Sequence, residues 1–453
     1  MRKRFFPLTL VFLLVACSAL QSAGGTHPPA VGETPTSVAS TSTPFPSVTF
    51  ATSPSERGLP SVTPSLISTQ TFIVPTPWPT ATLLAPLQAG ETLSMATLYM
   101  MDAVNGWGIE SRGYVLRTTD GGQTWKDVTP SQGIFIKGGF FALNADEAWA
   151  FPYLCFSFFC PDSWYATIWH TIDGGTTWQP SQPICLGGPG CKYDYELTTQ
   201  DLDPIAMQFV NRQTGWLLVN TQHLMMSDHC RLYQTTDGGN NWDLLGGSAT
   251  LPCGYEVKGI AFLDANTGWM GNSMINSPIV PGTNWGISAT RDGGQRWQIS
   301  QLPPPADLPT EFAGKPGWCD VENVSTIPPQ IVDLDIDCRV DNGGGTPRYH
   351  YHSVNGGGSW HSWQVTGSVQ FIDVINGWAL VPSADGGLGL LQRTEDGGWT
   401  WTTIKHLTWQ GVQFDFINRY VGWAIATSGD TSALVHTVDG GLTWTEIRPI
   451  VVP

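Results

Sequence analysis

The sequence Thr-Thr-Asp-Gly-Gly-Gln-Thr-Trp at residues 118–125 constrains the fold more than any other feature, because six related octets follow it. The tryptophans that end successive octets are separated by 53, 64, 55, 63, 41 and 43 residues. The later octets occupy residues 171–178, 235–242, 290–297, 353–360, 394–401 and 437–444. A segment that returns at such intervals is typical of a repeat architecture whose longer units carry insertions.

Each octet has the composition of a tight turn between two strands. Its aspartate can accept hydrogen bonds from backbone N–H groups further along the turn, its glycine pair supplies backbone with φ > 0, and Ser or Thr hydroxyls close both ends. Its final tryptophan is a large apolar side chain that can begin the next strand and pack between modules. We therefore expect the acidic or amide position of each octet to be structural: Asp120, Asp173, Asp237, Asp292, Asn355, Asp396 and Asp439.

A second signal, most often Gly-Trp, precedes six of the octets. It ends at Trp107, Trp149, Trp216, Trp269, Trp378 and Trp423. An apolar run, this signal, a strand that leads into the octet and a strand that starts at the octet tryptophan together predict four strands per repeat. The fifth repeat lacks the signal, and we expect its first strand near residues 331–338. The predicted fold is all-β, a seven-bladed β-propeller of four-stranded antiparallel blades whose closed ring leaves no exposed sheet edge.

The octets also match a known motif, Ser/Thr-x-Asp-x-Gly-x-Thr-Trp, the Asp-box or bacterial neuraminidase repeat. Octets 1, 2 and 7 match it fully, whereas Asn241, Arg296, Asn355 and Ser359 depart from it in octets 3, 4 and 5. With the Gly-Trp signals, about residues 92–449 resemble the propellers typified by the photosystem II assembly and stability factor. The resemblance extends more distantly to sortilin, xyloglucanases and sialidases. It implies the propeller fold and suggests a scaffold or assembly role.

The resemblance to sialidases and xyloglucanases raises the question of enzymatic activity. A sialidase would carry an arginine triad and an Arg-Ile-Pro motif near the first repeat, and this chain has no such motif. Arg117 and Arg393 stand at a repeated strand position before their octets. A xyloglucanase needs two opposed carboxylates across a groove, usually built from two propellers, and this chain has the length for one. These observations do not favour an enzyme, and we name no catalytic residue and no cofactor.

The N-terminal residues have the pattern of an export signal. Three basic residues, Arg2, Lys3 and Arg4, precede a short apolar run that ends in Leu-Val-Ala-Cys. This ending matches the bacterial lipobox, which predicts lipidation of Cys17 and anchoring to the outer face of a bacterial membrane, at the cell surface or in the periplasm. We expect a signal peptide at residues 1–16, a lipidated cysteine with a disordered Ser/Thr/Pro-rich linker at 17–90, and the propeller at 91–453.

Apart from Cys17, the chain has an even number of cysteines. They are Cys155, Cys160, Cys185, Cys191, Cys230, Cys253, Cys319 and Cys338. Pairing of nearest neighbours in this order is the prediction, although eight cysteines formally allow 105 connectivities. A zinc site is the alternative, but the spacings are irregular and no Cys-x-x-Cys pair is present.

The long insertions between predicted strands fall on one face of the propeller. In a four-stranded meander the octets and the turns before Gly-Trp share one end, the octet face, whereas the remaining connections share the opposite end, the insertion face. The insertions belong to blades 2–5 and carry aromatic and acidic residues that suit a protein or a sugar. The predicted binding residues are Trp164, Tyr165, Tyr193, Asp194, Tyr195, Glu196, Trp285, Trp318 and Asp320. Neutral decoration of a tolerant face is the alternative.

Charge narrows the range of partners. The chain has 21 Lys and Arg against 37 Asp and Glu, a net charge of −16, which repels phosphate backbones and excludes nucleic acid. We expect an unknown protein or complex at the cell surface as the partner of this membrane-tethered scaffold or assembly-factor-like lipoprotein. A glycan-binding or glycoside-hydrolysing surface lipoprotein is the alternative.

One acidic strand and a set of histidines contain residue types that bind metal ions. Alternation over residues 332–338 puts Asp333, Asp335 and Asp337 on one strand face, where calcium would find oxygen ligands. An exposed edge strand is the favoured interpretation, and no metal is predicted. A histidine precedes the octet in blades 2, 5 and 7, and the propeller symmetry separates these three too widely to share an ion: His170, His352 and His436.

Overall fold

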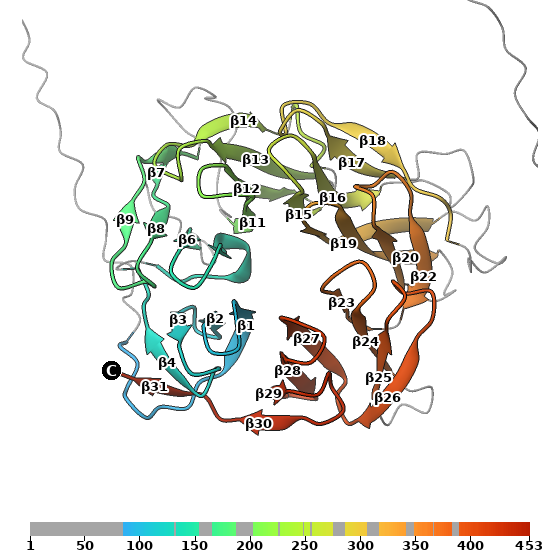
Figure 1. The fold of residues 1–453 in the computed structure, drawn as a ribbon. Helices are drawn as coiled ribbons and strands as arrows, with labels where there is room; N and C mark the ends of the chain where they lie inside the picture. Colours follow the sequence, from blue (N-terminus) through green and yellow to red (C-terminus); the bar gives the residue numbers. More distant parts are fainter. Residues whose placement is uncertain are drawn as a thin grey trace, which may run out of the picture. The chain divides into compact units, whose positions relative to one another are not determined.

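Seven four-stranded antiparallel sheets follow one another around a ring in the computed structural model, which confirms the predicted seven-bladed β-propeller (Figure 1). The structure describes residues 85–453 except 131–132, 154–164, 187–202, 225–226, 248, 254–255, 275–285, 306–316, 341–347, 366 and 383–388. The side chains at 222–224, 227–228, 273–274, 317–318, 339–340 and 382 are likewise outside the description.

Each blade contains four strands in chain order from the ring centre outward. Blade 1 contains β1 (Met95–Met100), β2 (Gly106–Glu110), β3 (Val115–Thr118) and β4 (Thr124–Asp127). Blade 2 contains β5 (Phe140–Ala142), β6 (Ala148–Ala150), β8 (Trp169–Thr171) and β9 (Gln179–Pro180). Blade 3 contains β11 (Asp203–Phe209), β12 (Gly215–Leu224), β13 (Ser227–Thr235) and β14 (Asp243–Gly247). Blade 4 contains β15 (Val257–Phe262), β16 (Gly268–Met274), β17 (Gly286–Thr290) and β18 (Gln298–Gln301). Blade 5 contains β19 (Gly317–Ile327), β20 (Ile331–Val340), β21 (Arg348–Ser353) and β22 (His361–Val365). Blade 6 contains β23 (Val369–Phe371), β24 (Gly377–Pro382), β25 (Gly389–Thr394) and β26 (Thr402–Leu407). Blade 7 contains β27 (Gly411–Phe416), β28 (Gly422–Ser428), β29 (Thr431–Thr437) and β30 (Thr445–Ile447).

A few short elements lie outside this pattern. β7 (Tyr165–Ala166) and β10 (Ile184–Cys185) pair with each other in the connections of blade 2. A 3-10 turn, η1 (Lys137–Gly139), precedes β5, and β31 (Ile450–Val452) lies at the C-terminal end.

The octets form the turns between the third and fourth strands. In the first octet, Oδ1 of Asp120 accepts hydrogen bonds from the backbone N–H groups of Gln123 and Thr124 at 3.1 and 2.9 Å, and Oδ2 accepts from the Thr124 hydroxyl at 2.6 Å. Gly121 and Gly122 have φ of 76° and 88°, a region that an L side chain rarely enters. The carboxylate is therefore engaged within its own turn. The same side-chain-to-backbone bond recurs at Asp173, Asp237, Asp292, Asn355, Asp396 and Asp439.

Tryptophans of the Gly-Trp signals fill the seams between blades. The indole Nε1 of Trp149 in blade 2 donates to the carbonyl of Gly238 in the octet of blade 3 at 2.9 Å, and Phe209 of blade 3 stacks on the same ring at 3.7 Å. Trp216 with Phe262, and Trp378 with Phe416, repeat this stacked pair at 3.7 Å. Each such pair therefore belongs to two blades at once, and the apolar core lies between the sheets.

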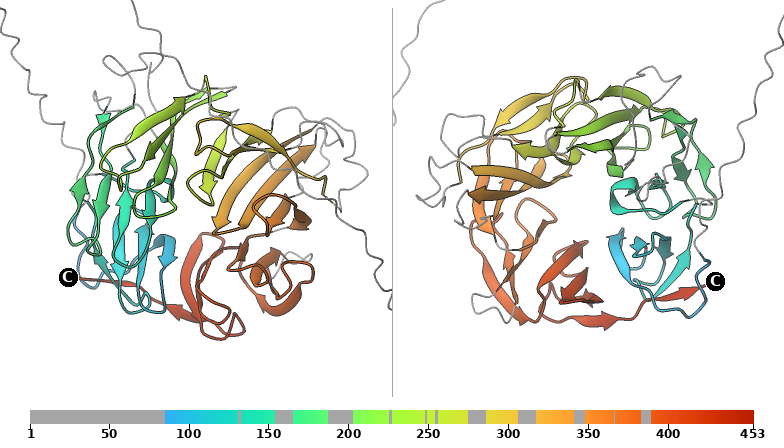
Figure 2. Two further views of the ribbon diagram at one scale, coloured as in Figure 1. Left: turned by 45° about the horizontal axis from the view of Figure 1, so that its top comes forward. Right: turned by 180° about the vertical axis from the view of Figure 1, so that it is seen from behind.

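The ring closes between blades 7 and 1, a point the sequence left open. β31 adds to the outer edge of blade 1 by pairing in parallel with β4, which makes that sheet five-stranded (Figure 2). Nε1 of Trp423 in blade 7 donates to the carbonyl of Gly121 at 2.9 Å. Nearer the centre, the backbone N–H of Met100 donates to Oδ2 of Asp415 at 2.5 Å.

Blade 5 differs from its prediction. Residues 331–338 are part of β20, the second strand of the blade, and β19 is the first strand. The predicted first strand was therefore wrong by one strand, because no Gly-Trp signal marks β20 as the second strand and the apolar residues of β19 are interrupted by polar ones. β20 also lies between β19 and β21, so the expected exposed edge strand is wrong as well. In addition, β19 pairs with the end of β16, which joins blades 4 and 5 into one eight-stranded sheet.

Candidate functional site

The seam between blades 5 and 6 has a composition unlike the others. In the other six blades, a second-strand tryptophan lies opposite the residue that precedes the octet, as in Trp149 opposite His170 and Trp378 opposite Arg393. In blade 5 the corresponding pair is Asp333 opposite His352. A carboxylate thus takes the register position that a seam tryptophan holds elsewhere.

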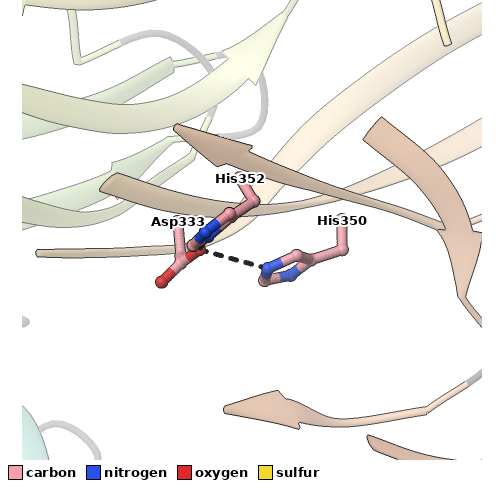
Figure 3. A group of neighbouring side chains, drawn as sticks. All are labelled: Asp333, His350 and His352. Atoms are coloured by element: carbon pink, nitrogen blue, oxygen red, sulfur yellow. Dashed lines mark hydrogen bonds and ion pairs between the residues drawn. The ribbon is translucent and has the colours of Figure 1, made fainter. Parts of the chain in front are cut away.

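Asp333 is joined there by two histidines from β21 (Figure 3). Nδ1 of His352 lies 2.6 Å from Oδ1 of Asp333, and Nε2 of His350 lies 3.3 Å from the same oxygen. One ligand atom from each residue lies within 4.8 Å of the others. All three side chains are buried, with 2–5 % of each residue exposed. These three residues are called the seam cluster below.

A second carboxylate orients one of the rings. Oδ1 of Asp335 lies 2.8 Å from Nδ1 of His350, and Nδ2 of Asn323 donates to the other oxygen of Asp335 at 3.3 Å. The last acid of the strand, Asp337, forms an ion pair with Arg348. The three acids therefore share one strand face, as predicted, but each lies opposite a different residue of β21.

The carboxylate and the imidazole rings of the seam cluster stabilise each other's charged forms. Burial would raise the pKa of Asp333, but hydrogen bonds from His350 and His352 hold it below its usual value. Burial likewise would lower the pKa of His350, but hydrogen bonds to Asp333 and Asp335 raise it to about 9. The cluster thus combines an ionised carboxylate with imidazole rings in a site closed to solvent.

Aromatic rings enclose the cluster on the side of blade 6. Phe371, from the first strand of that blade, stacks on His352 with a centroid distance of 4.1 Å and on His350 at 5.7 Å. Trp363, from the fourth strand of blade 5, lies 5.0 Å from the His350 ring. His352 therefore occupies the place against the next blade's phenylalanine that an indole ring occupies in blades 2, 3 and 6.

Sequence reasoning identified part of this cluster. It placed Asp333 on the correct strand face and His352 in a strand, but it did not single out His350. The available signal was His350-x-His352, which puts two imidazoles on one strand face, followed by the octet that fixes this strand as the third of the blade. The missing element was the pairing of this strand with the acidic one, because the acidic strand had been assigned as the first of the blade.

The insertion face of blades 2–5 contains two of the predicted disulfides. Cys230 in β13 is bonded to Cys253 before β15, and Cys319 in β19 is bonded to Cys338 in β20. Cys185 in β10 is also disulfide-bonded. Its predicted partner and the remaining predicted pair lie outside the described residues: Cys191, Cys155 and Cys160. Disulfides are characteristic of oxidising compartments, which agrees with an extracytoplasmic location.

Most of the predicted binding residues lie outside the described part of the chain. They are Trp164, Tyr193, Asp194, Tyr195, Glu196 and Trp285, together with the side chain of Trp318. Tyr165 lies in β7 and is 43 % exposed. Asp320 was expected to be exposed, and this is wrong: it is buried in β19, because β20 pairs with it on one side and the end of β16 on the other.

Large apolar side chains are exposed mainly on the opposite, octet face. Trp399, at a variable position of the sixth octet, is 70 % exposed and stacks on His361 at 3.8 Å. The other exposed apolar residues of this face are Val104, Ile172, Val354, Val374, Ile375, Tyr420, Val438 and Leu442. Sequence reasoning treated this face as scaffold and did not single out these residues.

Three comparisons place the chain among known proteins. No family model and no curated protein matches it. Among solved structures it is similar to YCF48 bound to D1 peptide, at 15% identity over 78% of this chain and 95% of that one, with a TM-score of 0.45. It is similar to YCF48 from Cyanidioschyzon merolae, at 15% identity over 78% and 99%, with a TM-score of 0.38. It is also similar to an ancestral GH74 enzyme, at 12% identity over 81% of this chain and 48% of that one, with a TM-score of 0.45.

At these identities the likeness concerns the propeller fold alone. Within the described residues, no helix is long and apolar enough to cross a membrane.

Proposed function

We propose that this protein is a membrane-tethered, extracytoplasmic scaffold that binds a protein partner through the insertion face of blades 2–5. The observation that carries the proposal is the extra β-structure and the disulfides on that face. β12 and β13 extend to 10 and 9 residues, β7 pairs with β10, and β16 pairs with β19. Loops that a rigid scaffold holds in place are common binding surfaces, and cross-links order them before a partner arrives.

The short connections of the other blades support the same choice of face. β28 and β29 of blade 7 are joined by a two-residue turn, and β2 and β3 of blade 1 by four residues. Among the described residues, the lengthened strands and the added strand pairs of this face therefore lie in blades 2–5, which are adjacent, as a single docking surface requires.

The described acidic groups do not favour the hydrolytic alternative. The octet aspartates accept hydrogen bonds within their own turns, and the carboxylate of the seam cluster is buried. A glycoside hydrolase needs two carboxyl groups that reach the same sugar from opposite sides. A glycan-binding lipoprotein remains the second candidate, favoured by the exposed Tyr165 ring, since aromatic faces also stack on sugar rings.

Photo-crosslinking in cells tests the location of the binding surface. A photoreactive phenylalanine analogue replaces Tyr165 on the insertion face or, as the matched control, Trp399 on the octet face. We expect a discrete crosslinked protein from position 165 and none from position 399. Crosslinking from position 399 alone would transfer the docking surface to the octet face and contradict the proposal.

A glycan array and a reducing-sugar assay on the purified full chain test the second candidate. We expect no glycan ligand and no sugar release. Glycan binding that Tyr165→Ala weakens, with an unchanged melting temperature, would replace the protein-binding proposal by the glycan-binding one.

The tether is tested at Cys17, which lies outside the described residues. Cys17→Ser removes the thiol that the lipobox predicts to be acylated, so we expect the variant to move from the membrane fraction to the soluble fraction. Ser18→Ala is the matched control, because it keeps Cys17 and the Leu-Val-Ala-Cys lipobox, and we expect this variant to stay in the membrane fraction. Continued membrane fractionation of Cys17→Ser would contradict the lipid anchor.

A further inference from the structure

We propose that Asp333, His350 and His352 bind one divalent transition-metal ion, with zinc as the best match, in the seam between blades 5 and 6. This site is independent of the proposed docking surface, because its three residues are buried inside the scaffold.

The donor atoms already have the separations of a coordination shell. Nδ1 of His352 and Nε2 of His350 converge on one carboxylate oxygen, at 2.6 and 3.3 Å, and all three ligand atoms lie within 4.8 Å of one another. Zinc bonds to nitrogen and oxygen are about 2.0–2.2 Å, so ligand atoms around a tetrahedral ion are separated by roughly 3.3 Å. Shifts of a few tenths of an ångström to about one ångström would place an ion between the rings and the carboxylate.

The chemistry of the ligands selects the class of ion. Two imidazole nitrogens and one carboxylate suit zinc and its neighbours among the divalent transition metals, whereas calcium and magnesium prefer shells made of oxygen. A fourth position can be taken by the second oxygen of Asp333 or by water. A calcium ion held by Asp333, Asp335 and Asp337 does not fit, because each of these acids lies opposite a different basic residue of β21.

The surroundings resemble those that orient metal ligands. A histidine that binds a metal usually gives its other ring nitrogen to a carboxylate, which fixes the ring and its tautomer. Asp335 lies 2.8 Å from Nδ1 of His350 and leaves Nε2 directed to the cluster. Asn323 in turn holds Asp335, and the rings of Phe371 and Trp363 exclude water from the side of blade 6.

The seams of other blades provide an internal comparison. The seams after blades 2, 3 and 6 contain an indole stacked on a phenylalanine, an apolar pair that needs no ion. Replacing that packing by a buried carboxylate and two imidazoles is unfavourable unless the charges are paired or coordinate a metal. Blade 2 has a histidine at the position of His352, His170, but it lies 3.3 Å from a single carboxylate, Glu147, and no second histidine accompanies it.

Metal content and affinity test the proposal on the full chain, prepared without a polyhistidine tag. The protein is stripped with a chelator, loaded with zinc, separated from free ion by gel filtration and analysed for metal. We expect close to one zinc per chain and an increase in melting temperature on loading. Correctly folded protein that retains no zinc would overturn the proposal.

Conservative variants assign the ligands. Asp333→Asn, His350→Gln and His352→Gln should each weaken zinc binding at least 100-fold, whereas His170→Gln in blade 2 should retain one zinc per chain. Asp335→Asn removes an orienting group and not a ligand, so we expect about 10–100-fold weaker binding with the stoichiometry kept. Zinc that remains bound to all three ligand variants would show that it binds elsewhere and would overturn the assignment.

If the ligand variants do not fold, X-ray absorption at the zinc edge of the wild-type protein identifies the ligand atoms instead. Two imidazole nitrogens at about 2.0–2.1 Å, with oxygen as the other neighbour, are expected. A shell made only of oxygen, or one that contains sulfur, would contradict the site.

Discussion

Asp415 in the first strand of blade 7 accepts a hydrogen bond from Met100 of blade 1, and Tyr99 is the residue before this donor; both Asp415 and Tyr99 are partly buried. Burial raises the pKa of Asp415 to about 7, although the backbone N–H of Met100 donates to its carboxylate and opposes the shift. Burial and the nearby Asp415 charge raise the pKa of Tyr99, so its phenol stays neutral throughout the range in which Asp415 titrates. Asp415 is therefore the group whose proton is coupled to closure of the ring.

Stability should fall as pH rises through the range of Asp415. A carboxyl whose pKa is raised on folding binds its proton more tightly in the folded state, so the free energy of unfolding falls between about pH 4 and pH 7 and then levels off. The loss is on the order of 1–3 kcal/mol after a discount for partial exposure of the side chain. Asp415→Asn keeps an oxygen for the Met100 N–H and removes the charge. Urea unfolding at pH 5 and pH 8 should show that Asn stabilises the protein more at pH 8, and equal effects at both pH values would contradict the assignment.

The octet aspartates have a lowered pKa in the folded protein, so their effect on stability has the opposite dependence on pH. Hydrogen bonds within the turn lower the pKa of Asp120 below its usual value despite partial burial, so its contribution is present near neutral pH and is lost in acid. Asp120→Ala leaves backbone N–H groups of the turn without a partner, and we expect a loss of about 1–3 kcal/mol by chemical denaturation. Asn355→Asp, which converts the fifth octet to the common residue, should be close to neutral. Loss of partner binding by Asp120→Ala at unchanged stability would contradict a structural role for the octets.

At the scale of strands and blades, the sequence was informative wherever a local signal repeats. The Gly-Trp signals and octets located the strands of blades 1–4, 6 and 7, because turn chemistry and seam packing are determined by neighbouring residues. Blade 5 has no tryptophan at the second-strand position, and its strands are defined by long-range pairing of β19 with β20 and of β16 with β19. The seam cluster depends on the same pairing, so Asp333 and His352 were seen separately and His350 was missed.

The disulfide between Cys230 and Cys253 should stabilise the insertion face of blade 3. It closes a segment with a sequence separation of 23, for which chain entropy predicts roughly 3 kcal/mol. The double variant Cys230→Ser with Cys253→Ser should lower the melting temperature and increase proteolysis between β14 and β15. Cleavage in blade 7, which has no cysteine, serves as the control and should not change. Equal stability and equal proteolysis with and without the disulfide would contradict a role in ordering this face.

For the whole molecule, the decisive contacts are those that close the ring. Val451 in β31 is buried against blade 1, and β31 covers the outer edge of β4. Val451→Asp places an unpaired charge in that position, so we expect a loss of several kcal/mol and faster amide exchange in β1–β4. Pro453→Ala, two residues away and exposed, is the matched control and should have no effect. Unchanged exchange in blade 1 of the Val451→Asp variant would show that the ring is closed by other contacts.

The closing contacts also bear on how the chain reaches its location. The Trp423 and Asp415 hydrogen bonds span 302 and 315 residues of sequence, so they form only after nearly the whole propeller is available. A polypeptide that leaves the cytoplasm N-terminus first exposes the outer strand of its first module long before the segment that covers it has crossed. An uncovered strand of this kind pairs readily with other chains. The translocation stage is therefore when two molecules in transit are most prone to associate incorrectly, and slow export or crowded secretion should reduce the yield of closed rings.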